Sequence, residues 1–145
     1  MLANHLGPTP GKDPAIQRDD WVEGLTELYD RLPATSRIVT LADSPEFETS
    51  PVLCLSSHLD DAERCAIPRS EAFNPSIRAA QAIVAEQHGG AVVDLSDYFC
   101  NATTCPAVIG ATLVYSDEHH VTATFSRSLA DVLEERLAAV LGSSG

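Results

Sequence analysis

Apolar residues recur at intervals of three and four positions in three long stretches of the chain. The clearest stretch runs from about Thr122 to Leu141, and Thr122 is suited to cap its N-terminus. The same spacing appears from about Asp13 to Leu32 and from about Pro75 to His88. We therefore expect three amphipathic helices.

Short runs of apolar and β-branched residues separate these helices. Arg37–Ala42 and Ala91–Leu95 are typical of strands covered on both faces, and Met1–Leu6 is typical of the end of another strand. Val108–Tyr115 is expected to form a small hairpin or extended segment that turns near Gly110. This alternation of strands and helices indicates an α/β domain with a parallel sheet between layers of helices.

The composition limits the size and the partners of such a domain. With 145 residues, of which 44% are hydrophobic and 21% charged, the chain is expected to form one domain over residues 1–145, with a disordered tail at about 142–145. Its formal net charge of −12 at pH 7 repels the phosphates of nucleic acids. The N-terminus lacks the features of a signal peptide, and no apolar run is long enough to cross a membrane.

The four cysteines fall into two local pairs, Cys54 with Cys65 and Cys100 with Cys105. Polar, turn-prone residues separate the members of each pair, so the sulfurs can meet. This arrangement favours two disulfides in a compartment outside the cytoplasm. The alternative is a zinc site, which usually contains a Cys-x-x-Cys knuckle, and neither pair has that spacing.

The richest group of reactive side chains is Asp117-Glu118-His119-His120, just before the last predicted helix. An Asp three residues ahead of a His can bind the Nδ1–H of the imidazole and select its tautomer. The other nitrogen of His120 is then free to accept a proton from a serine hydroxyl. Alternatively, these residues are merely solvated, with acids favoured near a helix N-terminus. A metal site is disfavoured because adjacent histidines point in different directions.

The stretch Cys105–Ala130 contains this Asp-x-x-His pair, followed by an apolar residue and a threonine that opens the last helix. It resembles the closing block of the SGNH-type domain found at the C-terminus of bacterial acyltransferase family 3 membrane proteins. Asp117 and His120 match the Asp-x-x-His of that block. Other segments follow in the order seen in such domains: Pro51–Cys54, Cys65–Arg69, Val93–Leu95 and Cys100. The resemblance covers most of the chain.

The resemblance implies a flavodoxin-like, three-layer α/β/α fold and an extracytoplasmic domain at the bacterial cell membrane. It implies transfer or hydrolysis of acyl groups, commonly acetyl, on cell-surface glycans, and two bridged cysteine pairs. In a Ser-His-Asp triad, His120 would act as base and then acid, and Asp117 would orient it. Asn4 falls where the family has an oxyanion-stabilising Asn, although it also suits an ordinary loop.

The partners implied by the family are an acyl donor, a carbohydrate acceptor and an N-terminal membrane acyltransferase domain. Neither a cofactor nor a metal ion is expected. SGNH enzymes carry their serine in a Gly-Asp-Ser block after the first strand, and this chain contains no such block. Ser56 and Ser57 precede His58 but lie within the Cys54–Cys65 loop, after the wrong strand.

We therefore expect that the chain lacks the first strand and the nucleophile of its domain, and that it is inactive in isolation. A second hypothesis is a non-catalytic extracytoplasmic binding domain that keeps the SGNH fold without a nucleophile.

Overall fold

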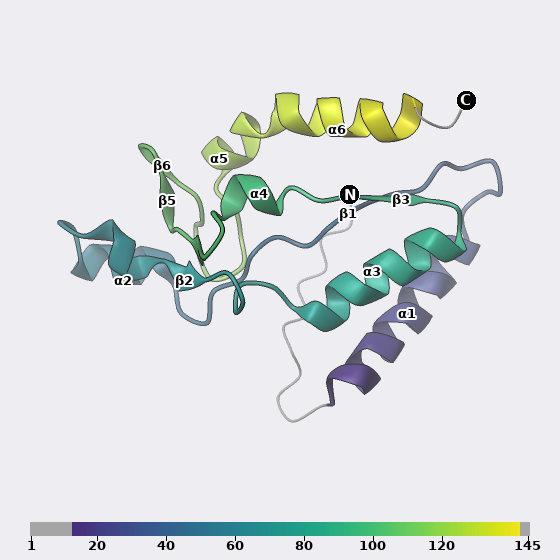
Figure 1. Cartoon of the computed structure of the whole chain (residues 1–145), viewed down its shortest axis with the longest axis horizontal. Helices are drawn as coiled ribbons and strands as arrows, with labels where there is room; N and C mark the ends of the chain where they lie inside the picture. Colours follow the sequence, from purple (N-terminus) through teal and green to yellow (C-terminus); the bar gives the residue numbers. More distant parts are fainter. Residues whose placement is uncertain (1–12, 143–145) are drawn as a thin grey trace. The chain divides into compact units, whose positions relative to one another are not determined.

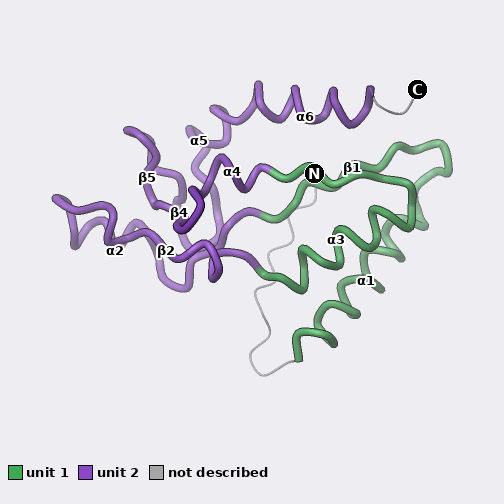
Figure 2. Tube along the Cα trace, viewed as in Figure 1, with its two compact units in different colours: residues 1–43, 74–94 green, residues 44–73, 95–145 purple. Residues whose placement is uncertain are grey.

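The computed structural model describes residues 13–142 and divides into two compact units (Figures 1 and 2). The first unit contains the chain up to Asp43 together with Asn74–Asp94, and the second contains Ser44–Phe73 together with the chain from Leu95 onward. The strand expected at the N-terminus and Asn4 lie outside the described residues. The tail expected at 142–145 also lies outside them, apart from Gly142.

The first unit is built on a pair of parallel strands. Strand β1 (Val39–Leu41) pairs with β3 (Ala91–Val93), with Thr40 opposite Val92. Helix α3 (Pro75–Gln87) packs on these strands, and α1 (Pro14–Asp30) lies along α3 (Figure 1). The predicted bounds of both helices are correct to within two residues at each end.

Local signals explain where α3 begins and ends. The side chain of Asn74 accepts hydrogen bonds from the backbone of Ser76 and Ile77, and Pro75 occupies the first turn, where no N–H is needed. The helix ends at Gln87, and Gly89, just beyond the C-cap His88, has a φ of 62° that suits glycine. At Gly90 a Cβ would lie 2.8 Å from the Ile38 carbonyl oxygen, so a side chain there would clash with the segment that leads into β1.

Polar contacts join α1 to the rest of the first unit. The Ser76 hydroxyl donates to the Pro14 carbonyl at 2.8 Å. Near the other end of α1, the hydroxyls of Tyr29 and Thr40 lie 2.5 Å apart. Since most apolar side chains of α1 are only half-buried, these hydrogen bonds help to set its position on α3.

The second unit contains short elements joined by disulfides. Its elements are α2 (Pro51–Ser57), the 3₁₀ helix η1 (Ala62–Cys65), β2 (Ile67–Pro68), α4 (Ser96–Phe99), β4 (Thr104–Cys105), β5 (Val108–Ile109), β6 (Thr112–Leu113), α5 (Ala123–Ser128) and α6 (Ala130–Gly142). Strand β2 pairs antiparallel with β4, and β5 forms the predicted hairpin with β6, turning at Gly110 with φ 60°.

An aromatic cluster forms the core of the second unit. Phe47, Phe99, Tyr115 and Phe125 are all buried. The ring centroids of Phe47 and Tyr115 are 4.7 Å apart, and those of Phe99 and Phe125 are 5.2 Å apart. These rings bring together the segment after β1, helix α4, the segment after β6 and helix α5, and they support the loop described below.

The last predicted helix is interrupted. Instead of one helix from Thr122 to Leu141, the chain forms α5 and α6, separated at Leu129. Thr122 caps α5 as expected, because its hydroxyl accepts from the Phe125 backbone at 3.2 Å. The Ser128 hydroxyl donates to the Phe125 carbonyl at 2.7 Å. Such bonds to a carbonyl in the preceding turn bend helices, which accounts for the break.

Candidate active site

The loop between β6 and α5 carries the Asp-x-x-His pair, and short backbone contacts close its base. Tyr115 forms an isolated antiparallel bridge with Val121, and the Ser116 N–H donates to the His120 carbonyl at 2.8 Å. The Thr122 backbone N–H donates to the Val114 carbonyl at 2.8 Å, and its hydroxyl donates to the Leu113 carbonyl at 2.6 Å. The four residues Asp117–His120 therefore form a small, tied loop.

Asp117 organises this loop from within. Its Oδ1 accepts hydrogen bonds from the backbone N–H of His119 at 2.9 Å and of His120 at 2.8 Å. This is the local side-chain-to-backbone pattern that Asp favours in turns. The same carboxylate lies 2.8 Å through Oδ2, and 2.9 Å through Oδ1, from Nδ1 of His120. The predicted carboxylate–imidazole contact is therefore present in the structure.

Hydrogen bonding keeps the Asp117 carboxylate charged. The bond from the His119 backbone has the largest effect, and together with the bonds from His120 it lowers the pKa of Asp117 to about 2. An ionised carboxylate can only accept hydrogen bonds, so Nδ1 of His120 must carry the proton. In the neutral imidazole, Nε2 is then the unprotonated nitrogen and can act as a base.

The reactive edge of His120 is open to solvent. The His120 side chain is 72% exposed and that of Asp117 is 42% exposed. Within residues 13–142, no group hydrogen-bonds to Nε2 of His120. An imidazole that is oriented at one nitrogen and accessible at the other is suited to take a proton from a hydroxyl and to return it.

A contact from the segment after β1 supports the loop. The backbone N–H of Phe47 donates to the Glu118 carbonyl at 2.9 Å. Phe47 and Tyr115 are both buried, and their rings pack against each other. The Asp117–His120 loop is thus anchored at its base by the Tyr115–Val121 bridge and within the loop by the Phe47 hydrogen bond to Glu118. Sequence reasoning missed this contact, because nothing local at Phe47 indicates which carbonyl its N–H will meet.

Two serines within the chain, Ser56 and Ser57, precede a histidine, but both take part in local hydrogen bonds. Ser56 and Ser57 lie on α2, and their hydroxyls donate to the Leu53 carbonyl at 2.7 Å and 3.3 Å. Neither hydroxyl is hydrogen-bonded to His120 in the described part of the chain. These contacts are typical of helical serines and give no support to a catalytic role.

Both cysteine pairs form disulfides, Cys54 with Cys65 and Cys100 with Cys105, as their spacing predicts. His58 lies next to the first disulfide, so that its ring nitrogen and the two sulfurs fall within 4.8 Å of one another. These three residues resemble a set of metal ligands. Zinc binds thiolates, however, and the two sulfurs are bonded to each other, so the oxidised chain has no such ligands at this position.

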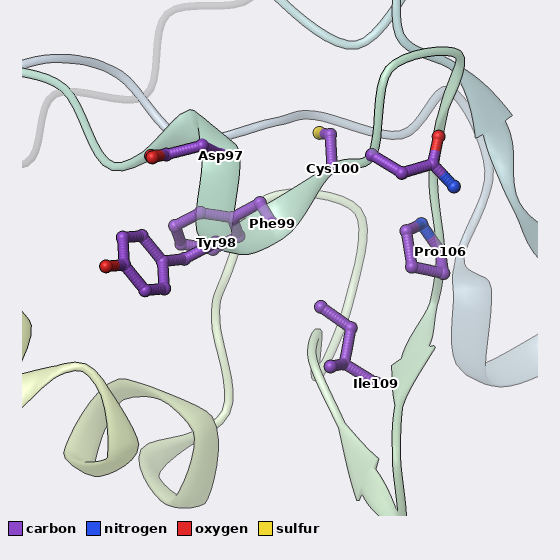
Figure 3. Close-up of a pocket in the computed structure, with 7 residues that line it drawn as sticks. Asp97, Tyr98, Phe99, Cys100, Pro106 and Ile109 are labelled. Atoms are coloured by element: carbon purple, nitrogen blue, oxygen red, sulfur yellow. The ribbon is translucent and has the colours of Figure 1, made fainter.

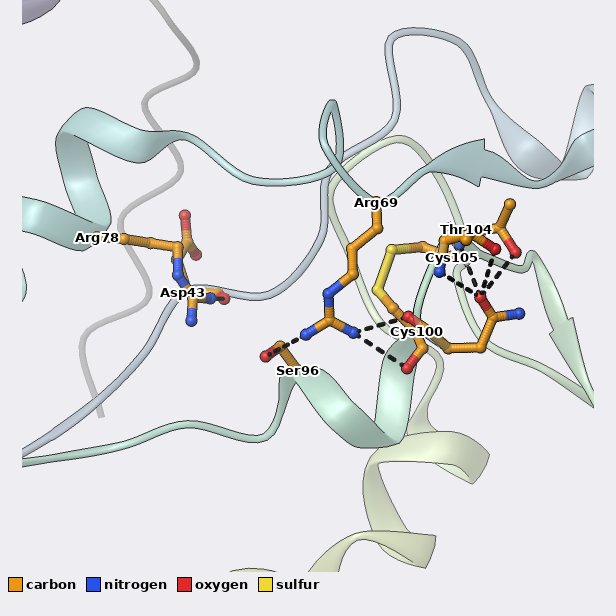
Figure 4. The surroundings of a disulfide bond; sticks show 9 residues. Asp43, Arg69, Arg78, Ser96, Cys100, Thr104 and Cys105 are labelled. Atoms are coloured by element: carbon orange, nitrogen blue, oxygen red, sulfur yellow. Dashed lines mark hydrogen bonds between the residues drawn. A yellow bond between two sulfur atoms is a disulfide. The ribbon is translucent and has the colours of Figure 1, made fainter.

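Arg69 braces the second disulfide loop, a role that nothing in its local sequence indicates. Its guanidinium donates to the carbonyls of Cys100 at 3.2 Å and Asn101 at 2.9 Å, and to the Ser96 hydroxyl at 3.2 Å (Figure 4). A half-buried arginine that binds three oxygens fixes the path of the chain from α4 into the loop.

The comparison with protein families assigns the chain to a class. The chain matches the SGNH domain that is fused to AT3 domains, over residues 3–135. It belongs to this family and has its α/β fold. The match confirms the resemblance seen in the sequence, and it makes the chain a hydrolase-like domain associated with acyltransferases. No curated protein and no solved structure matches the chain.

The family association concerns a membrane acyltransferase domain. None of the helices within residues 13–142 has both the length and the hydrophobicity to span a membrane.

Proposed function

We propose that this chain supplies the histidine and aspartate of a Ser-His-Asp centre that transfers or hydrolyses O-acyl groups on cell-surface glycans. The observation that carries the proposal is the hydrogen bond between Asp117 and Nδ1 of His120, combined with an accessible Nε2. The serine comes from polypeptide outside these 145 residues, since the sequence contains no Gly-Asp-Ser block. In the intact protein the domain faces the extracytoplasmic side, next to the membrane acyltransferase domain.

The proposed reaction has two halves. In the first, Nε2 of His120 takes the serine proton while the serine oxygen bonds to the carbonyl carbon of the acyl donor. The leaving group then departs with the proton from His120. In the second half, a glycan hydroxyl or water gives its proton to Nε2 and attacks the acyl-serine, and the serine recovers a proton from the imidazolium.

Asp117 contributes in both halves without changing its own protonation. Its carboxylate selects the tautomer with the proton on Nδ1, and its negative charge stabilises the imidazolium that forms transiently. The two backbone N–H groups that bind Oδ1 hold the carboxylate in place. Asn4, outside the described residues, is the proposed side-chain donor to the oxyanion. One such donor contributes roughly 3–4 kcal/mol to transition-state stabilisation in acyl transfer.

The proposal is tested first on the 145-residue chain itself. Without the serine, the purified chain should not hydrolyse p-nitrophenyl acetate above the buffer rate. Turnover that His120→Ala abolishes would show that the nucleophile lies inside the chain, which contradicts this assignment.

The second test uses the intact protein with its acyl donor and glycan. His120→Ala should abolish transfer, because the variant lacks the imidazole that takes the serine proton. His88→Gln is a matched control, since His88 also pairs with an aspartate, Asp30, at 3.0 Å, but lies in the first unit. If both variants transfer acyl groups at the rate of the unaltered protein, His120 is not the catalytic base.

The second candidate function is a binding domain that retains the fold without catalysis. The missing Gly-Asp-Ser block is the observation that favours it. The two functions differ in what the intact protein contains. An upstream serine whose replacement stops transfer supports the enzyme, and a protein whose reading frame begins at Met1 supports the binding domain.

A further inference from the structure

An open cavity of about 300 Å³ lies in the second unit, against α4 and the Cys100–Cys105 loop. Figure 3 shows Tyr98 on one side of the cavity and Pro106 and Ile109 on the other. Phe99 is buried and contributes to the lining, whereas Tyr98 is 39% exposed. The cavity thus combines a sheltered apolar lining with an exposed aromatic ring.

The wall formed by the disulfide loop is braced by a covalent bond and several hydrogen bonds. The disulfide closes the loop, and Arg69 binds its carbonyls at Cys100 and Asn101 (Figure 4). Within the loop, Oδ1 of Asn101 accepts from the backbone N–H groups of Thr103 and Thr104, both at 2.8 Å. A site with this many internal bonds needs little ordering when a ligand binds.

The same hydrogen bonds determine what Asn101 can offer to a ligand. They engage its Oδ1, while its Nδ2 has no hydrogen-bond partner among residues 13–142. Asn101 is exposed and lines the cavity. It therefore presents two N–H donors on a fixed side chain, which are suited to a neutral oxygen acceptor such as a hydroxyl.

Asp97, the acidic residue of the lining, forms an ion pair. Its carboxylate accepts from Arg136 at 2.7 Å, and in Figure 3 it points away from Pro106 and Ile109. The Arg136 guanidinium also lies 5.5 Å from the centroid of the Tyr98 ring, which holds that ring in place. None of the lining residues is basic, and the one acidic lining side chain is already paired with Arg136. With a net charge of −12 on the chain as well, the cavity does not favour an anion and is suited to an uncharged ligand.

We propose that this cavity binds one neutral pyranose ring of a glycan, with an apolar ring face against Tyr98 and a hydroxyl on Asn101. A pyranose has an apolar face that can pack on an aromatic ring and hydroxyls that can stay in water at the open rim. The volume lies at the small end for ligand sites, which suits a single ring. An acyl chain fits less well, because an open cavity would leave much of its apolar surface in water.

The choice of a glycan as ligand rests on the proposed function, in which a glycan is the acyl acceptor, and the cavity would be where that glycan binds. It does not depend on the role of His120. Binding is therefore measured without catalysis, so that either proposal can fail alone.

The test is an NMR titration of the ¹⁵N-labelled chain with neutral trisaccharides of glucose, galactose, mannose and N-acetylglucosamine, and separately with octanoate. We expect at least one trisaccharide to shift the amide signals of Tyr98, Asn101 and Ile109. Tyr98→Ala should weaken its binding about tenfold, whereas Tyr98→Phe, which keeps the ring, should change it less than about twofold.

Two further variants complete the design. Asn101→Asp keeps an oxygen for the loop bonds but removes the two donors, and should weaken binding by about three- to tenfold. Leu59→Ala alters an apolar side chain that is 89% exposed and outside the cavity lining, and should have no effect. The proposal is overturned if octanoate alone shifts these signals, if no trisaccharide does, or if Tyr98→Ala binds as tightly as the unaltered chain.

Discussion

The carboxylate of Asp117 lies 2.8 Å from Nδ1 of His120, and two backbone N–H groups bind the same carboxylate. The aspartate therefore orients the imidazole and is itself oriented by the loop that both residues share. This arrangement needs no residue from a distant segment, because its members lie within four consecutive positions.

The first prediction concerns Asp117→Asn. The asparagine oxygen can still accept the backbone bonds, but an amide cannot select the Nδ1–H tautomer as a carboxylate does. We expect the loop to keep its backbone chemical shifts while the imidazole ¹⁵N shifts of His120 report a changed tautomer. In the intact protein, transfer should fall by up to about 10⁴-fold. An unchanged tautomer in the variant would mean that Asp117 does not orient His120.

The second prediction concerns the acid stability of the Asp117 contact. The pKa of Asp117 is lowered from 3.8 to about 2. A lowered pKa in the folded state means that the stabilisation is complete above the unfolded value and is lost as the pH falls through about 2. The ¹³C signal of the Asp117 carboxylate should therefore titrate near pH 2. A midpoint near 3.8 would show that the backbone bonds do not stabilise the charged form.

The third prediction concerns the pair that joins α1 to α3. The hydrogen bond from Nε2 of His88 to Asp30, with a second bond to the Val84 carbonyl, raises the pKa of His88 above 6.5. A raised pKa means that the stabilisation is complete below about pH 6.5 and is lost as the pH rises through the folded-state value. Urea unfolding of the unaltered chain and of His88→Gln should differ more on the acidic side of this range than on the basic side. Equal differences on both sides would contradict it.

The fourth prediction concerns Arg69. Its replacement by methionine keeps much of the apolar stem but leaves two carbonyls and the Ser96 hydroxyl without this donor. We expect the free energy of unfolding to fall by about 2 kcal/mol, within the range for hydrogen bonds that involve a charged group. Arg64→Met is the matched control at an exposed position and should change it by less than about 0.5 kcal/mol. Equal effects would mean that Arg69 does not brace the loop.

Several elements could be predicted because their signals lie next to each other in the chain. Asn74 and Pro75 mark the start of α3, and the glycine at 89 marks its end. The break at Leu129 could not be predicted in this way. The apolar spacing continues through Leu129, whereas the break is associated with a hydrogen bond from the Ser128 hydroxyl to the Phe125 carbonyl, and the pattern of apolar residues gives no sign of such a bond.

Other contacts could not be predicted because they join distant segments. Arg69 meets Ser96 and the Cys100 carbonyl, and Phe47 meets Glu118, only after the chain has folded back on itself. The antiparallel pairing of β2 with β4 is of the same kind. Two-residue strands carry too little pattern to indicate their partners.

Local spacing along the chain was enough to predict the α/β class, the two cysteine pairs and the closeness of Asp117 to His120, because a separation of a few residues limits what a local segment can do. Only the folded arrangement sets which edge of His120 stays open, how the disulfide loop is braced and where a cavity forms beside Tyr98. Those properties depend on side chains from separate segments that compete for the same space and the same hydrogen bonds, and the outcome of that competition is settled only by packing.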